Sequence, residues 1–335
     1  MREGEDDLIS EVNKNFEIIK LKRLSTRFDF SMKSIINIPS DNFRWLGCSQ
    51  KEDSKEFIKA INNYGLNNID WIIADNYDID IEWETIVSKK LRLLNNSSRT
   101  RFLIIDDLAN RKHNADIIVD HNLITKKKIE NYKKLLSENC IKLIGPDYAL
   151  LGEEYKILRE SISPRKNVNR ILVYFGATDP DQMTYKTFLA LQNLNYEKIK
   201  IDIVLSKKDE HFNDIKVISD KEKNLYLYEK VNSMASLIAR ADLAFGAGGI
   251  SALERGCLGL PSIVIVTANN QYEGALELYN QGNIIYLGKS YLLEVLDIQK
   301  TVEMFIKGRE IVKKPMFIDG NGCERVASIV LSNSI

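Results

Sequence analysis

The chain has 335 residues, which is long enough for two domains of ordinary size, each with its own hydrophobic core. It contains 47 basic and 47 acidic residues, so no surplus of one sign directs it to nucleic acid or to an anionic membrane, and a small molecule is the expected partner. No apolar run approaches the roughly 20 residues that span a bilayer, and the acidic first residues are unlike a signal peptide, so we expect a cytoplasmic protein.

The four cysteines do not suggest a metal site or a disulfide framework. Cys48, Cys140, Cys257 and Cys323 are far apart in the sequence, and no C-x-x-C spacing is present. We therefore expect a reduced protein that uses neither a metal nor another cofactor.

The first half of the chain predicts a parallel sheet with polar groups at one edge. A strand is expected at residues 16–19 and a helix at residues 53–64, and three buried strands follow at residues 71–74, 102–105 and 117–119. These three strands end in the motifs D-N-Y, D-D and D-H-N, respectively. Because the carboxyl ends of parallel strands lie at the same edge of a sheet, we expect the polar groups to share the edge where ligands usually bind.

A polar segment divides the chain. Residues 161–169, S-I-S-P-R-K-N-V-N, show no hydrophobic period and contain a proline, which is typical of a linker. We therefore predict an N-terminal domain over residues 1–160 and a C-terminal domain over residues 161–335. Strand and helix patterns alternate in both halves, which predicts the α/β class, with parallel sheets covered by helices on both faces.

The stretch from Ala241 to Gln271 combines a strand, a glycine turn and a helix. An apolar strand runs into Gly246, Gly248 and Gly249, and a helical pattern begins at Ser251. Such glycines let the backbone approach a ligand, and the unpaired N–H groups and dipole of the first helical turn favour an anion such as a diphosphate. The full G-x-G-x-x-G spacing is absent, so a packing role for the turn is equally open.

Two further polar features follow in the same stretch. Glu254 lies one turn into the helix, where its carboxylate could accept hydrogen bonds from a ribose; a solvated helix residue is the alternative. Arg255 is interpreted as a packing or solvated residue. The next apolar strand, residues 262–266, ends in the amide cluster N-N-Q at residues 269–271. We expect the glycines, the carboxylate and the amides to converge on one edge of the sheet.

Longer motifs occur in order along most of the chain. They are D-N-Y-D-I-D-I-E-W from Asp75, I-D-D-L-A-N-R-K-H from Ile105, G-P-D-Y-A-L-L from Gly145, F-G-A-T-D-P from Phe175, G-A-G-G-I-S-A-L-E-R-G-C-L-G-L-P from Gly246 and D-G-N-G-C-E-R-V from Asp319. Together they resemble the UDP-2,4-diacetamido-2,4,6-trideoxy-β-L-altropyranose hydrolases of pseudaminic acid biosynthesis and the related spore-coat polysaccharide proteins.

The resemblance implies two Rossmann-like domains in a GT-B arrangement, in which the C-terminal domain binds UDP and the N-terminal domain forms the sugar and catalytic side. It implies hydrolysis of a UDP-linked diacetamido-trideoxy sugar to the free sugar and UDP. Carried over to this sequence, Gly248, Gly249 and Ser251 would lie at the diphosphate, and Glu254 at the ribose.

Other positions follow from the same resemblance. Asn270 and Gln271 are expected near the phosphate and the sugar, and Asn270 is a candidate for catalysis. Tyr77 matches a tyrosine of the family's active site; it could orient a sugar hydroxyl or N-acetyl group, or simply cover the sheet edge. Gly176 and Asp179 are expected to face the substrate from the first turn of the second domain.

The front of the chain departs from the family pattern. The family begins with a strand and a G-x-G-H-x-x-R turn whose histidine serves as the base, whereas residues 7–19 here already resemble the next helix and the second strand. We therefore expect an N-terminal domain that lacks its first strand. That strand is central in a doubly wound sheet, and each buried backbone group left unpaired costs about 1–3 kcal/mol. We accordingly hypothesise that the natural gene product starts upstream of Met1.

Asp75, Asp107 and His113 are the remaining candidates for the base. A histidine has a suitable pKa for this task, but His113 is also consistent with a surface or packing role. Asp107 adjoins Asp106 at a strand end, so the two side chains should diverge, and capping of the next turn is as consistent with the pattern as catalysis.

Three functions are compatible with the sequence. The first is the hydrolase, the second a GT-B glycosyltransferase in which an acceptor hydroxyl replaces water, and the third a catalytically inactive nucleotide-sugar binder. No basic amphipathic helix that would seat a lipid acceptor is evident, which argues against a membrane-associated transferase. We expect a monomer that acts on a UDP-sugar.

Overall fold

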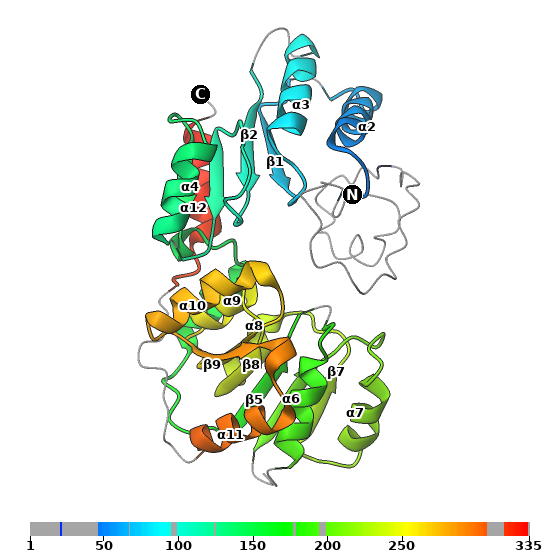
Figure 1. Cartoon of the computed structure of the whole chain (residues 1–335), viewed down its shortest axis with the longest axis vertical. Coiled ribbons are helices and arrows are strands. Elements are labelled where there is room, and N and C mark those ends of the chain that lie inside the picture. The colour runs from blue at the N-terminus through cyan, green and yellow to red at the C-terminus, as the bar shows by residue number, and fades with distance from the viewer. Residues whose placement is uncertain are drawn as a thin grey trace. The chain divides into compact units, whose positions relative to one another are not determined.

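The computed structural model describes Leu21 and residues 46–66, 68–94, 99–123, 125–176, 179–193, 199–306 and 318–333. The chain divides into two compact units (Figure 1). The first consists of Met1–Asp120 and Lys126–Leu143, and the second of His121–Thr125 and Ile144–Asn333. The strand expected at residues 16–19, and with it the expectation about a missing first strand, lies outside the described residues.

The first unit contains a four-stranded sheet in the order β1-β2-β3-β4. Its strands are β1 (Trp71–Asp75), β2 (Arg101–Ile105), β3 (Ile117–Asp120) and β4 (Ile141–Ile144). β1 pairs with β2, and β2 with β3, in parallel register. The three strands predicted in this half are therefore confirmed, and their carboxyl ends are neighbours.

A side-chain cap and a buried hydrogen bond fix the first two described helices of this unit. Ser49 and Glu52 form a capping box at the start of α2 (Gln50–Asn63), because each side chain accepts a hydrogen bond from the other residue's backbone N–H. The Trp83 indole of α3 (Ile81–Leu94) donates to Asp53 of α2 over 2.9 Å. A third helix among the described residues of this unit is α4 (Lys126–Leu135). α2 and α3 are thereby fixed to each other beside the sheet.

The second unit contains a six-stranded sheet in the order β10-β9-β8-β5-β6-β7. Its strands are β5 (Arg170–Tyr174), β6 (Lys200–Val204), β7 (Leu225–Tyr228), β8 (Leu243–Gly246), β9 (Ser262–Val266) and β10 (Ile285–Lys289), all paired in parallel. Renumbered within the unit this is the order 3-2-1-4-5-6 of a doubly wound Rossmann sheet. The strand order reverses between β5 and β8, so the ligand-binding crevice of such a fold is expected at their carboxyl ends.

Helices cover both faces of this sheet, as the alternation of patterns predicted. Ile171 and Val173 are buried with α6 (Met183–Gln192), α7 (Phe212–Ser219) and α11 (Val295–Ile306). Leu172, which lies between them in β5, is buried with the helices of the opposite face. Those helices are α5 (Glu153–Ser161), α8 (Met234–Arg240), α9 (Ile250–Cys257) and α10 (Tyr272–Asn280). The chain ends with α12 (Gly322–Ser332).

Residues 144–160, which were expected in the N-terminal domain, belong to the second unit. Leu151 and Tyr155 are buried in the same core cluster as α8 and α9. The boundary expected at residue 160 therefore falls inside this unit, because α5 buries its apolar face against these helices.

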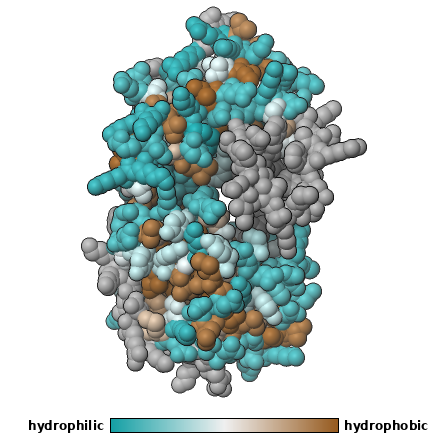
Figure 2. All heavy atoms as spheres, in the orientation of Figure 1, coloured by the Kyte–Doolittle hydropathy of each residue, from teal (hydrophilic) through white to brown (hydrophobic). Residues whose placement is uncertain are grey.

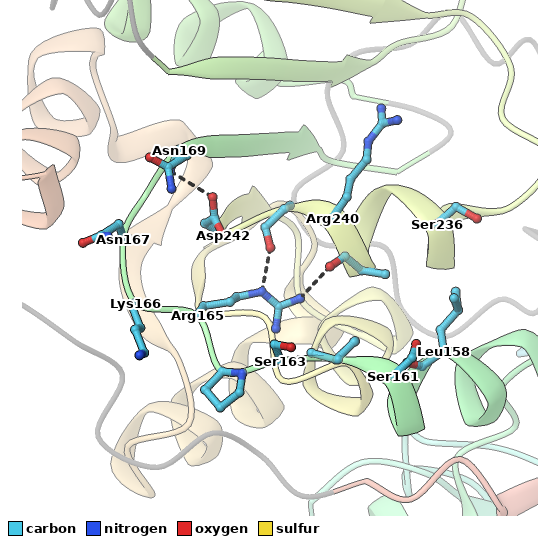
Figure 3. Close-up of a pocket in the computed structure, with 14 residues that line it drawn as sticks. Leu158, Ser161, Ser163, Arg165, Lys166, Asn167, Asn169, Ser236, Arg240 and Asp242 are labelled. Carbon is cyan, nitrogen blue, oxygen red and sulfur yellow. Dashed lines mark hydrogen bonds between the residues drawn. The ribbon is translucent and has the colours of Figure 1, made fainter.

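Residues 161–169, expected to be a linker, form hydrogen bonds with residues at the ends of α8 and α9 and with Asp242. Arg165 donates from Nε to the Ala241 carbonyl over 2.6 Å (Figure 3). It also donates from Nη1 to the Leu258 carbonyl over 2.7 Å. Asp242 accepts from the backbone N–H of Asn169 over 2.9 Å. Arg165 thus satisfies carbonyls at the C-terminal ends of α8 and α9, where a cation also complements the helix dipoles.

The helices were also compared with the length and hydropathy of membrane-spanning segments. Among the described residues, no helix combines the length and the apolar character needed to cross a bilayer. Figure 2 shows one face of the molecule, which is mostly hydrophilic with hydrophobic residues in separate groups.

Candidate functional site

Two loops meet where the order of the second sheet reverses. Tyr174 at the end of β5 is in register with Gly246 at the end of β8. The loop after β5 continues through Gly176, whose φ of +106° is one that L side chains rarely adopt. The loops after β5 and β8 therefore start side by side at one edge of the sheet.

The first helical turn after β5 is already occupied by a carboxylate. Asp179 accepts hydrogen bonds from the backbone N–H of Met183 over 3.0 Å and of Thr184 over 2.6 Å. These are N–H groups at the start of α6, so Asp179 acts as the cap of this helix. An anion would be repelled here, and Asp179 directs both oxygens to its own backbone.

The helix after β8 has no such cap among the described residues. α9 begins after Gly249, which has a φ of +69°, and no side chain that the structure describes accepts a hydrogen bond from the backbone N–H groups of its first turn. Of these two helix N-termini, the one at α9 is thus the one open to an external acceptor, with the dipole favouring a negative charge.

The glycines of this turn also have a packing role. A Cβ on Gly246 would lie 2.6 Å from the Tyr174 carbonyl oxygen and 2.6 Å from the Arg255 guanidinium. A Cβ on Gly248 would lie 3.1 Å from Cβ of Gln271. The packing interpretation of these two glycines is therefore confirmed, and the ligand interpretation stays a prediction.

The amide cluster lies at the same edge. Asn270 and Gln271 are in the 3₁₀ turn η2 (Asn269–Gln271) that follows β9. Oε1 of Gln271 accepts from the Thr267 backbone N–H over 3.2 Å, and its side chain contacts the position of Gly248. Asn270 is exposed. The predicted convergence of the amides and the glycine turn is confirmed for Gln271.

Glu254 is held rather than solvated. Its Oε1 accepts a hydrogen bond of 2.7 Å from the Tyr155 hydroxyl, and Ser251, one turn earlier in α9, also hydrogen-bonds to it. Burial raises the pKa of Glu254 above its ordinary value, and these two hydrogen bonds only partly offset the effect. Tyr155 was not identified from the sequence, because an aromatic residue on the apolar face of a helix indicates only core packing.

Arg255 is a second residue that the sequence interpretation missed. It is 2% exposed, and its guanidinium donates from Nη2 to the Ala247 carbonyl over 2.6 Å and from Nε to Ser262 Oγ over 3.1 Å. Burial lowers the pKa of Arg255 to about 10. The packing interpretation is confirmed and the solvated one is wrong: a buried guanidinium supports the glycine turn from behind.

In the first unit, two predicted residues come together at the strand ends. An Asx turn after β1, in which Asn76 Oδ1 accepts from the Asp78 N–H over 2.9 Å, surrounds Tyr77. The Tyr77 hydroxyl hydrogen-bonds to the Asp107 carboxylate at the end of β2. Burial and then the charge of Asp107 raise the pKa of Tyr77 above its ordinary value, so the phenol stays neutral and donates.

Asp106, adjacent in sequence, faces a different set of partners, as expected for diverging side chains. Its Oδ1 lies 2.8 Å from Nη1 of Arg111, and its Oδ2 lies 3.7 Å from Nε2 of His113. Nδ1 of His113 lies 2.6 Å from Oε1 of Glu84. His113 and Asp106 are 4% and 1% exposed, so this cluster lies inside the unit.

The protonation of this cluster follows from its contacts. Burial alone would lower the pKa of His113, but the nearby carboxylate of Asp106 and the hydrogen bond with Glu84 raise it above its ordinary value. Burial alone would raise the pKa of Asp106, but His113 and Arg111 hold it below its ordinary value. His113 is therefore a buried partner of two carboxylates that favour its protonated form, and the packing alternative describes its position. Among the residues that the structure covers, no three His, Cys, Asp or Glu side chains are grouped as ligands of a metal.

Comparison with known sequences places this geometry in context. Residues 171–316, which include β5, the glycine turn and η2, match the glycosyltransferase family 28 C-terminal domain. The chain is 28% identical over 193 residues to the spore coat polysaccharide biosynthesis protein SpsG of Bacillus subtilis, covering 56% of this chain and 57% of that protein. The chain spans about half the length of the curated relatives that it matches.

Solved structures share the fold. The S. aureus MnaA–UDP co-structure has a TM-score of 0.58 at 11% identity, covering 98% of this chain and 93% of that one. The Acinetobacter baumannii MurG structure has a TM-score of 0.56 at 14% identity, covering 98% and 88%. The fold class expected from the sequence is therefore confirmed: α/β with parallel sheets, in two Rossmann-like domains of the GT-B type.

Proposed function

We propose that this protein binds a UDP-sugar through the glycine turn and α9, and hydrolyses it to UDP and the free sugar. The observation that carries the proposal is the uncapped N-terminus of α9, which lies where the strand order of a doubly wound sheet reverses. Support comes from the match of this segment to a glycosyltransferase C-terminal domain, and from the UDP bound in a structure of the same fold.

In the proposed complex, the diphosphate accepts hydrogen bonds from the turn at Gly248, Gly249 and Ser251. Backbone N–H groups in fixed positions stabilise the charge that develops on the leaving UDP, without reorganisation during the reaction. Glu254 accepts from the ribose hydroxyls, and Gln271 lies beside the turn to contact the phosphate or the sugar. Gly176 lies on the neighbouring loop, and Asn270, exposed on η2, is available to the sugar.

We assign the base to Asp107. Its carboxylate is half-buried and hydrogen-bonded by the neutral Tyr77 hydroxyl, whereas Asp106 and His113 are buried in ion pairs. In the proposed step the oxygen of a water attacks the anomeric carbon, Asp107 takes a proton from that water, and the bond from this carbon to the UDP oxygen breaks. Tyr77 keeps the carboxylate oriented. The proposed sugar is the diacetamido-trideoxy sugar of the hydrolase family that the motifs resemble.

The test is turnover of that UDP-sugar in water enriched in ¹⁸O, with no acceptor present. Hydrolysis predicts UDP together with a free sugar that carries one ¹⁸O at its anomeric carbon. Binding of the UDP-sugar with no product would indicate an inactive binder. Absence of any binding to UDP or the UDP-sugar would reject the proposal as a whole.

A glycosyltransferase is the second candidate, because the matched domain model is named for that activity. In that case an acceptor hydroxyl replaces the water, and UDP is released only when an acceptor is added. The same assay with and without a panel of sugar and lipid acceptors therefore separates the two activities.

A further inference from the structure

The buried side chain of Arg255 holds one peptide group of the glycine turn. Its Nη2 donates to the Ala247 carbonyl over 2.6 Å, while its Nε donates to Ser262 Oγ over 3.1 Å. Ser262 Oγ in turn donates to the Leu260 carbonyl over 2.9 Å. The guanidinium is therefore fixed between the start of β9 and the turn, and the missing Cβ of Gly246 leaves the space that it occupies.

The position of this carbonyl determines where the next amide faces. The Ala247 carbonyl and the Gly248 N–H belong to one peptide group, and in a trans peptide these two groups point in opposite directions. Because Arg255 draws the carbonyl toward the interior, the Gly248 N–H faces away from it. Among the residues that the structure covers, none accepts a hydrogen bond from this N–H.

We propose that Arg255 is a positioning residue for the diphosphate, which presents the Gly248 N–H to a phosphate oxygen and adds its own buried positive charge behind the turn. The inference rests on the proposed function, since it assumes that the turn binds UDP. A donor that is already held in place needs no reorganisation when the ligand binds. The electrostatic attraction between the guanidinium and a phosphate is also stronger in a buried setting than in water. Arg255 itself is too buried to be a contact of the substrate.

The experiment compares the affinities of uridine, UMP and UDP for the wild-type protein and for Arg255→Met and Arg255→Lys, by calorimetry. We expect Arg255→Met to weaken UDP binding by about 10- to 100-fold, as for loss of a hydrogen bond to a charged group, and to leave uridine binding little changed. Arg255→Lys, which keeps the charge, should recover part of the loss. Arg165→Met is the matched control, because that guanidinium binds carbonyls at the other end of α9.

The outcomes separate the inference from the function on which it rests. If Arg255→Met lost the same affinity for uridine as for UDP, or lost none for either, the proposed role of Arg255 would be overturned. Binding of UDP by the wild-type protein would in that case still support the site. A wild-type protein that does not bind UDP would overturn both. If Arg255→Met does not fold, the NMR chemical shift of the Gly248 amide proton in the wild-type protein is measured instead. UDP should move this resonance downfield, and a resonance that does not move at saturating UDP would refute the inference.

Discussion

The Tyr155 hydroxyl donates a hydrogen bond of 2.7 Å to Oε1 of Glu254, which links α5 to α9. Tyr155 is 3% exposed, and burial with the nearby charge of Glu254 raises its pKa well above the ordinary value. The phenol therefore remains a donor, and its hydrogen bond fixes the orientation of the Glu254 carboxylate, which is proposed to bind the ribose. α5 thus contributes to the proposed nucleotide site, although it precedes the first strand of this sheet.

Tyr155→Phe should lower UDP affinity several-fold while the ring continues to pack. The variant removes a hydrogen bond to a carboxylate, for which about 1.5–3 kcal/mol is the usual range, and part of this loss will appear in the stability of the free protein. Calorimetry with UDP and 2′-deoxy-UDP measures the effect. Because Tyr155 orients the carboxylate that is proposed to bind the ribose, the ratio of the affinities for UDP and 2′-deoxy-UDP should be smaller in Tyr155→Phe than in the wild type. An unchanged preference would mean that Tyr155 only stabilises the fold.

Glu254→Ala should weaken UDP binding by roughly 1–3 kcal/mol, since it removes a charge-assisted hydrogen bond to the ligand. It also leaves the Tyr155 hydroxyl without its acceptor, so thermal unfolding should be measured in parallel. Glu277→Ala on α10 is a suitable control, because Glu277 bonds to Gln281 on the surface. UDP affinity equal to that of the wild type would remove Glu254 from the site.

Asp107→Asn should reduce turnover of the UDP-sugar by at least about 100-fold, the usual contribution of general base catalysis, with little change in UDP affinity. The neighbouring Asp106→Asn is its matched comparison. That variant should mainly lower stability, since it removes a buried carboxylate from between Arg111 and His113. Steady-state kinetics and urea unfolding distinguish the two. If Asp106→Asn abolished turnover in a stably folded protein and Asp107→Asn did not, the assignment of the base would be wrong.

The strands could be predicted because their runs of buried β-branched and leucine residues are local. β3 and β9 are buried along their whole length, and residues 117–119 and 263–266 within them are continuously apolar. The expected meeting of the glycine turn with Gln271 also followed, since parallel strands place their carboxyl ends at one edge.

What the sequence could not show were the partners of individual polar side chains. Asp179 follows a glycine turn, as a ligand residue would, yet it caps α6. Arg255 follows Glu254 in a helix and was equally consistent with solvent exposure, because only the packing of α9 on β9 turns it inward. His113 differs from a surface histidine only through Glu84, which is 29 positions earlier in the chain. A contact between residues 29 positions apart leaves no period or spacing in the sequence.

The His113 cluster predicts a specific dependence of stability on pH. The pKa of His113 is raised in the folded protein, so its contribution to the free energy of unfolding is full below its unfolded value of about 6.5 and is lost as the pH rises through the folded pKa. The pKa of Asp106 is lowered from 3.8, so its contribution is full above that value and is lost as the pH falls through the folded pKa.

Urea unfolding between pH 5 and 9 tests this dependence in the wild type and in His113→Asn. The wild-type protein should lose stability on the alkaline side of about pH 6.5, and His113→Asn should be less stable at pH 5 but with a smaller alkaline loss. Parallel curves for the two proteins would show that His113 gains no charge-dependent stability from Glu84 and Asp106.

Gly246→Ala tests the tight packing beneath the glycine turn. The new Cβ would lie 2.6 Å from the Tyr174 carbonyl oxygen, which is backbone of the adjacent strand and cannot rotate away, and 2.6 Å from the Arg255 guanidinium. Overpacking of this kind costs about 1–3 kcal/mol, so the urea midpoint should fall. Gly274→Ala in α10 is the control: its Cβ would meet Asn122 at an ordinary 3.7 Å, and a helical glycine replaced by alanine gains up to about 1 kcal/mol. UDP affinity should fall only in Gly246→Ala, because the displaced guanidinium would release the Ala247 carbonyl; an unchanged midpoint and affinity would contradict this account of the turn.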